Sequence, residues 1–346
     1  MAPKIFITGI TGYIAGDAFY VLYKAHPDYE YSALLRTQEK ADKVTSLYPN
    51  LRPVIGSLDD SSVLEEEASK ADIVLHAADA SDHEGAARAI SKGLAKGHSK
   101  ETPGFWLHTG GTGILTYFDS KDNRLGEEWT RSEFNDYSGV SELTNLPDEA
   151  FHRNVDKIVL ETAETHGDVV KTAIICPPTI YGKGRGPISG RGRQVYELTT
   201  LILRKAYAPV IGKGKAKWDN IHIHDLSSVY LLLVSAAVSR NLSSEIWGQK
   251  GYFLTENGRH VWGDLSRFIA EKASEMGAIP PDFRVESLSK QEAWETADFQ
   301  ALSWGLNSMG KAERARKVLG WEPKECSLEE EVPRIIEGER ELMGKK

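Results

Sequence analysis

A glycine-spaced segment near the N-terminus constrains the fold of this chain more than any other feature. The string "KIFITGITGYIAG" places Gly9, Gly12 and Ala15 between an apolar β run and a helical pattern. Gly9 permits a tight turn, Gly12 lets backbone N–H groups approach a pyrophosphate, and the small Ala15 lets helix and strand pack closely. An ordinary strand–helix turn can also use glycine, but these flanking elements favour a dinucleotide site.

Short apolar runs alternate with helical patterns through the first half of the chain. This alternation predicts an α/β fold of the Rossmann type, a doubly wound parallel sheet with helices on both faces. A polar stretch over 116–145 interrupts it and is longer than a compact connection needs. The expected strands are 4–9, 31–36, 51–58, 72–78, 104–111 and 169–182, and the expected helices are 12–26, 39–48, 61–71, 82–98 and one from Pro147 to about 166.

The pattern changes beyond Gly182. Residues 183–194 form a loop rich in glycine and arginine, 220–238 have the pattern of a strand followed by a helix, and 262–276 that of another helix. We therefore predict a nucleotide-binding Rossmann domain over 1–180. A smaller substrate-binding lobe is expected over 181–346, with 220–238 as a candidate to return to the core.

Composition argues against several classes of function. The net charge of −8 disfavours a nucleic-acid partner. No run approaches the ~18 consecutive apolar residues of a membrane span, and the N-terminus has no signal-peptide pattern. Two cysteines without metal-ligand spacing predict neither a disulfide framework nor a metal site. We expect a cytoplasmic protein whose partner is a small molecule.

The end of the second strand favours one form of dinucleotide. An acid there would bind the ribose of NAD, whereas a cation accommodates the 2′-phosphate of NADP. The strand ends "ALLRTQEK", with Arg36 at its tip and Lys40 one turn further. The sequence therefore predicts NADP as cofactor, the alternative being that Arg36 is a solvated strand end.

A series of motifs follows the glycine loop in fixed order: "GSLDD" at 56–60, "HAAD" at 76–79, "HTGGTG" at 108–113 and "PPTIYGKG" at 177–184. Together with the glycine loop, this series resembles the extended short-chain dehydrogenase/reductase family, and within it most resembles uncharacterised fungal epimerase/dehydratase-like proteins. The resemblance covers nearly the whole chain, and implies a homodimer that pairs through the helices beside the fifth strand.

The resemblance also implies a set of site residues. In the glycine loop these are Thr11, Tyr13 and Ile14, and the expected substrate pocket includes Tyr181 and Trp218. The remaining cofactor contacts implied are Ser57 and Leu58 at the adenine, Ala77, Ala78 and Asp79 along the ribose–phosphate stretch, Pro177 and Thr179 near the nicotinamide, and Lys157 at the nicotinamide ribose.

Two positions depart from the family pattern. The catalytic serine or threonine is expected near 111, where this chain has Gly111 flanked by Thr109 and Thr112. The catalytic tyrosine of Tyr-x-x-x-Lys is expected at 153, where "FHRNVDK" places Arg153. A guanidinium stays protonated and cannot donate a proton, but it can hold a substrate anion by a bidentate pair.

Three residues are candidates for the proton transfer that the missing tyrosine would perform. We rank them as Lys157, whose pKa burial would lower, then Tyr137 of the polar insertion, then His152, with Thr112 as a further catalytic candidate. Arg185, Arg191 and Arg193 are candidates to bind an anionic substrate. His222 and His224 share a strand face, but the sequence shows no third ligand for a metal.

These residues favour an NADP-dependent reductase of a small organic carbonyl or conjugated double bond. The runner-up within the family is a nucleotide-sugar or small-molecule epimerase or dehydratase. A different class, a non-catalytic protein that senses NADP(H), is the alternative that loss of the serine and tyrosine would favour.

Overall fold

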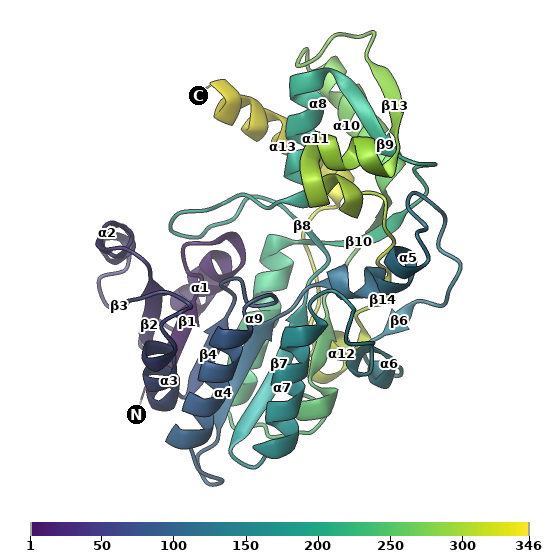
Figure 1. The fold of residues 1–346 in the computed structure, drawn as a ribbon. Coiled ribbons are helices and arrows are strands. Elements are labelled where there is room, and N and C mark those ends of the chain that lie inside the picture. Colours follow the sequence, from purple (N-terminus) through teal and green to yellow (C-terminus); the bar gives the residue numbers. More distant parts are fainter. Residues whose placement is uncertain (1, 345–346) are drawn as a thin grey trace.

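The structure, a computed structural model, describes residues 2–344 and has two lobes (Figure 1). The larger lobe is built on a seven-stranded sheet in the order β11-β7-β5-β4-β1-β2-β3, with every neighbouring pair parallel. Its strands are β1 (Lys4–Thr8), β2 (Glu30–Leu35), β3 (Arg52–Ile55), β4 (Ile73–His76), β5 (Gly104–Thr109), β7 (Val170–Cys176) and β11 (Tyr252–Leu254).

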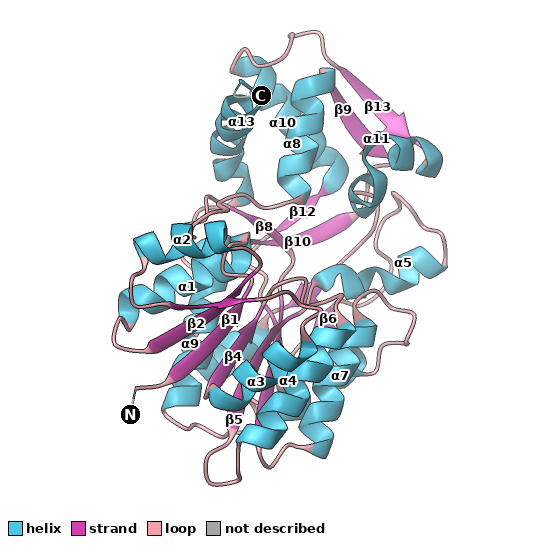
Figure 2. Cartoon of the chain, turned by 60° about the vertical axis from the view of Figure 1, so that its left-hand side comes forward, coloured by secondary structure: helices cyan, strands magenta, loops and turns pink. Residues whose placement is uncertain are grey.

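Helices cover both faces of this sheet, which confirms the predicted Rossmann-type α/β fold. On one face α1 (Tyr13–Ala25) packs against α9 (Ile223–Val238), with α2 (Gln38–Leu47) near the β3 edge (Figure 2). On the other face α4 (Glu84–Gly97) lies between α3 (Ser61–Lys70) and α7 (Arg153–Thr165). The strands are buried almost throughout, as expected for a parallel sheet covered on both sides.

The hydrophobic core of the larger lobe uses segments from beyond residue 180. Buried side chains of α9, β11 and α12 (Glu313–Leu319) belong to the same cluster as the sheet, together with Trp321. The chain therefore enters the core again after it has built part of the second lobe.

The smaller lobe has its own apolar cluster and little sheet. Its two-stranded sheet pairs β9 (Tyr207–Ile211) with β13 (Arg284–Leu288) in parallel. A three-stranded sheet of β8 (Thr179–Tyr181), β10 (Lys217–His222) and β12 (Arg259–Val261) lies between the lobes (Figure 2). The helices of this lobe are α8 (Gln194–Lys205), α10 (Trp262–Glu275), α11 (Lys290–Ser303) and α13 (Leu328–Gly344).

Two expected elements differ in the structure. The strand expected over 169–182 is two strands, because the chain leaves the main sheet at Pro177 and β8 joins β10 instead. The helix expected to begin at Pro147 begins at Arg153, because His152 has a positive φ of 68° that helical backbone does not allow. The polar stretch holds the short elements α5 (Tyr117–Lys121), β6 (Phe134–Asn135) and α6 (Val140–Thr144), and η1 (Thr112–Thr116) leads into it. The strand β6 pairs with β14 (Gly310–Lys311).

Within residues 2–344, no helix has the length and apolar character that a membrane crossing requires. The cytoplasmic location stays a prediction.

The contact between α3 and α4 depends on two glycines of α4. A Cβ at Gly93 would lie 2.3 Å from the carbonyl oxygen of Glu65, and one at Gly97 would lie 2.0 Å from that of Ser69. Both neighbours are backbone atoms of α3, which cannot move without moving the helix.

We expect Gly93→Ala to lower the free energy of unfolding by about 1–3 kcal/mol, although alanine favours helix, because the added methyl overpacks this contact. The control is Gly338→Ala in α13, where a Cβ has no neighbour within 4 Å. That substitution should raise stability by up to about 1 kcal/mol. Denaturant unfolding of both variants measures the difference, and equal effects would contradict the packing argument.

Candidate functional site

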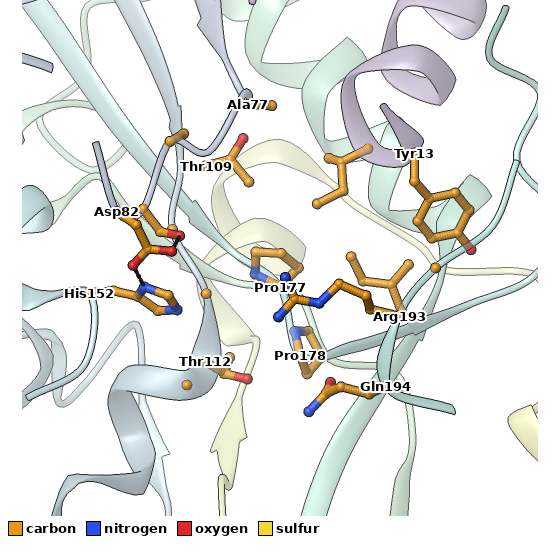
Figure 3. Close-up of a pocket in the computed structure, with 18 of the residues that line it drawn as sticks. Tyr13, Ala77, Asp82, Thr109, Thr112, His152, Pro177, Pro178, Arg193 and Gln194 are labelled. Atoms are coloured by element: carbon orange, nitrogen blue, oxygen red, sulfur yellow. Dashed lines mark hydrogen bonds and ion pairs between the residues drawn. The ribbon is translucent and has the colours of Figure 1, made fainter. Parts of the chain in front are cut away.

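A cavity of about 410 Å³ opens where the C-terminal ends of the sheet strands face the smaller lobe (Figure 3). Its walls come from the glycine loop, the ends of β4 and β5, the start of α7, and the loop that leads into α8. This is the edge at which α/β sheets bind their ligands.

The glycine loop has the geometry that a pyrophosphate needs. Gly9 has a φ of +84°, and a Cβ there would lie 2.8 Å from the backbone nitrogen of Ala78. The Gly12 backbone N–H donates to the Gly9 carbonyl at 2.7 Å, and no side chain caps α1. The first free N–H groups of α1 therefore lie beside the cavity, so these residues fit a dinucleotide phosphate.

The structure brings most, but not all, of the expected cofactor residues to the cavity. Tyr13, Ile14, Ala77, Asp79 and Pro177 line it together with Gly9 and Gly12.

Other expected cofactor residues lie outside the cavity lining. Thr179 donates its hydroxyl to Gln194, and Ala78 contributes its backbone behind Gly9. Thr11, Ser57 and Leu58 are half-buried, Arg36 is exposed just beyond β2, and Lys40 is half-buried in the first turn of α2.

A histidine–carboxylate pair forms one wall of the cavity. His152 Nδ1 donates to Asp82 Oδ1 at 2.8 Å, and the imidazole is only 11% exposed (Figure 3). Burial raises the pKa of Asp82, but the hydrogen bond and charge of His152 outweigh it and hold that pKa below its ordinary value. With Nδ1 committed to Asp82, His152 presents Nε2 to the cavity.

The free nitrogen of His152 occupies space that two glycines leave open. A Cβ at Gly111 or at Gly113 would lie 3.3 Å from Nε2, closer than ordinary packing allows. A serine at 111, the family's usual residue, would therefore crowd this imidazole. The ring of Phe151 lies 3.7 Å away, centroid to centroid, and also holds the imidazole in place.

The register of α7 corrects the expected role of Lys157. Lys157 is half-buried, and its Nζ pairs with Asp148 at 2.9 Å rather than facing the cavity. The residue one turn after His152 is Asp156, which is buried behind Gly110 and accepts a hydrogen bond from Tyr252 at 2.8 Å. This register places no lysine from α7 at the cavity.

The structure also places three further residues that were expected at the site, and only one of them lines the cavity. Arg153 is buried outside the cavity lining, so it is not placed to bind a substrate there. The ring of Tyr137 lies 4.3 Å from the Nζ of Lys317, which belongs to α12, and Tyr137 does not line the cavity. Thr112 does line the cavity: its hydroxyl accepts from Trp218 Nε1 at 3.2 Å, which leaves its own proton free to donate.

The substrate-facing residues are only partly those expected. Trp218 and Arg191 line the cavity, whereas Tyr181 is buried and donates its hydroxyl to the Cys326 carbonyl. Phe299 and Gln300 of α11 close the cavity from the other lobe, and no sequence pattern indicated them. Asp82 was also missed, because nothing in the chain order shows that it meets His152.

His222 and His224 gain an acidic neighbour that the sequence did not reveal. Glu325 lies 3.3 Å from His224 Nδ1, and ligand atoms of the three residues fall within 4.8 Å of one another. His222 Nδ1 already accepts the His224 backbone N–H, and His224 Nε2 contacts the Lys183 carbonyl. These contacts give both rings a structural role, and the absence of a metal site stays a prediction.

Comparison with known proteins identifies relatives of this chain and solved structures that share its fold. No family model matches the chain. Oxidase ucsJ of an Acremonium species is 38% identical over 99% of both chains, and an uncharacterised protein of Saccharomyces cerevisiae is 24% identical over 95% of this chain and 97% of its own.

Solved structures share the fold at lower identity. UDP-glucose 4-epimerase of Thermotoga maritima superposes with a TM-score of 0.65 at 17% identity, covering 98% of this chain and 99% of its own. The dTDP-glucose 4,6-dehydratase DesIV of Streptomyces venezuelae, solved with NAD, superposes with a TM-score of 0.67 at 14% identity, covering 99% and 98%.

The chain belongs to the extended short-chain dehydrogenase/reductase family. The relative that is 38% identical carries the name oxidase, and several of the fold neighbours were solved with NAD bound. His152 and Asp82 lie at the cavity wall, next to the position where the family pattern predicts a tyrosine.

Asp156 allows a test of the register of α7. Burial raises the pKa of Asp156 to about 6, against the opposing effects of the Tyr252 hydrogen bond and the charges of His152 and Arg153. Because this folded-state pKa exceeds the unfolded value of about 4, the folded state binds the extra proton, and stability is lost as pH rises from about 4 through about 6.

We expect the free energy of unfolding of the native protein, relative to Asp156→Asn, to fall by about 3 kcal/mol between about pH 4 and about pH 7. Denaturant unfolding across this range measures the difference. Parallel pH profiles for the two proteins would show that Asp156 is not buried as described.

Proposed function

We propose that this protein is an NADP-dependent reductase of a small organic carbonyl or conjugated double bond, with His152 as proton donor. The observation that carries the proposal is the His152–Asp82 pair at 2.8 Å, with Nε2 facing a cavity shared with the glycine loop. A buried donor at this wall supplies what the missing tyrosine would supply.

Bound NADPH would supply a hydride to the substrate carbon. In carbonyl reduction, His152 Nε2 gives its proton to the developing alkoxide oxygen, so that an alcohol forms as the carbonyl π bond breaks. Asp82 accepts the Nδ1–H throughout, which orients the ring and balances the charge of its protonated form. Thr112, whose hydroxyl proton is free, donates a hydrogen bond to the same oxygen. The same groups act in reverse for oxidation of the alcohol.

NADP is proposed over NAD on the charges beyond β2. Arg36 is exposed, and within residues 2–344 it has neither an ion pair nor a hydrogen bond from its side chain. Thr37 caps α2 through the Lys40 backbone N–H at 3.3 Å, so Arg36 and Lys40 flank a helix N-terminus. Two cations at a helix N-terminus suit a 2′-phosphate.

The same observations give less support to the two rival functions. A non-catalytic sensor of NADP(H) has no need of a buried histidine–carboxylate pair directed at the cavity. An epimerase or dehydratase would use a base at the same wall, and turnover of its substrates distinguishes it.

We expect His152→Gln to lower kcat by about 10²–10⁴-fold, with NADPH affinity unchanged, because glutamine keeps a polar side chain but transfers no proton. Asp82→Asn should lower kcat less and change its pH profile. Loss of NADPH absorbance with a panel of aldehydes, ketones and enones measures turnover, and calorimetry measures NADPH binding. Loss of turnover in Lys157→Met, but not in His152→Gln, would instead favour the lysine.

We expect Arg36→Glu to weaken NADPH binding by about 10–100-fold, because it replaces a positively charged hydrogen-bond donor with a carboxylate that repels the 2′-phosphate. NADH affinity should not fall. The control, Lys24→Glu, makes the same change of charge in the last turn of α1. Equal loss for NADPH and NADH would contradict the assignment of the 2′-phosphate to Arg36.

A further inference from the structure

The arginine-rich loop carries three guanidinium groups, and two of them are already matched by buried carboxylates. Arg185 Nη2 pairs with Asp17 Oδ1 at 2.6 Å, and Asp17 is fully buried. Arg191 binds Glu339 through Nε and Nη2 at 2.7 and 2.9 Å, and Glu197 through Nη1 at 2.7 Å. To bind a substrate anion, either arginine would have to leave a buried carboxylate unpaired, which is costly.

Arg193 is different from the other two. In the part of the chain that the structure describes, no carboxylate lies within ion-pair distance of its guanidinium. It extends into the cavity toward Pro177, from the side opposite His152 (Figure 3). Its polar neighbour is Gln300, whose amide oxygen, when turned toward it, accepts from Nη2 at 2.9 Å. The guanidinium therefore forms no ion pair, although the charge of Asp82 lies within its electrostatic range.

Aromatic and proline side chains line part of this end of the cavity, beside the polar side chains of Gln194 and Ser303. Phe151 and Phe299 lie 5.1 Å apart, centroid to centroid, and are 41% and 40% exposed although both are aromatic. Trp218, Pro177 and Pro178 form the walls behind them. Such surfaces favour a flat apolar ligand that stacks on the rings.

The backbone of α11 is bent to bring these groups to the cavity. Ala297 and Asp298 are non-helical, and Asp298 has a positive φ of 49°. The kink lies directly before Phe299 and Gln300. Strain of this kind in a non-glycine residue is typical of functional sites.

We propose that the substrate is a compact aromatic or conjugated carbonyl compound that carries a single carboxylate, held bidentately by Arg193. This inference rests on the proposed function and specifies its substrate class. The flat body lies against Phe151 and Phe299, and the carbonyl oxygen faces Thr112 and His152. A nucleoside diphosphate sugar does not fit this charge pattern, because its two phosphates would meet one free arginine rather than a cluster.

The test measures binding rather than turnover, so that its failure is distinguishable from failure of the proposed function. The protein, saturated with NADP⁺, is titrated by calorimetry with 4-formylbenzoate, with its methyl ester, and with UDP-glucose. The variants are Arg193→Gln and a matched control, Arg204→Gln, an exposed arginine at the other end of α8. Thermal unfolding of each variant shows that it is folded.

We expect the native protein to bind the acid at least about tenfold more tightly than the ester, and Arg193→Gln to remove this preference while it leaves ester binding unchanged. Arg204→Gln should behave as the native protein. Equal affinity for acid and ester, no binding of the acid, or tighter binding of UDP-glucose than of either probe would overturn the proposal. Selective binding of the acid without NADPH-dependent turnover would support this site and count against the reductase.

Discussion

The buried carboxylate of Asp17 joins the two lobes at the point where the cavity forms. It accepts from the backbone N–H of Arg185 at 2.7 Å and from Ser227 of α9 at 2.7 Å, in addition to the Arg185 guanidinium. Close approach of Gly186 to Gly16 accompanies these bonds, since a Cβ at Gly186 would lie 2.7 Å from the Gly16 Cα. The arginine-rich loop is thereby held across the first turns of α1, directly above the glycine loop. This buried anchor at the start of the loop and the Arg191–Glu339 pair near its end together hold the loop over the cofactor site.

The departures from the family's catalytic pattern are coupled through packing. His152 has a left-handed backbone conformation directly before α7, its imidazole pairs with Asp82, and Lys157 pairs with Asp148 away from the cavity. Gly111 leaves room for this imidazole, because a Cβ there would lie 3.3 Å from Nε2 and would displace the ring by a few tenths of an ångström. The absence of serine and tyrosine, which taken alone favours loss of catalysis, is therefore also what a histidine-based site needs. The two departures from the family pattern, at Gly111 and Arg153, are far apart in the chain but concern the same wall of the cavity.

The sequence predicted the alternating strands and helices of the main sheet well, but it did not predict the departures from that alternation. Six strands of the main sheet and the glycine loop followed from apolar runs and glycine spacing, which are local patterns. The seventh strand, β11, has three residues, and its pairing with β7 is a long-range contact that no local pattern indicates. The start of α7 was misplaced because Pro147, Asp148 and Glu149 are favourable at a helix start, whereas the conformation of His152 depends on its contacts.

By itself, the sequence determined the class of fold, the dinucleotide loop and the cation beyond β2, because each depends on residues that are neighbours in the chain. The tertiary structure alone decided which charged groups are free to act. Arg185, Arg191 and Arg193 are equivalent along the chain, yet Asp17 and Glu339, from opposite ends of the sequence, neutralise two of them. His152 likewise gains its role from Asp82, seventy residues away. Electrostatic partners are set by distance in space. The order of residues in a chain that leaves its core after Cys176 and returns to it at Ile221 does not reveal that distance.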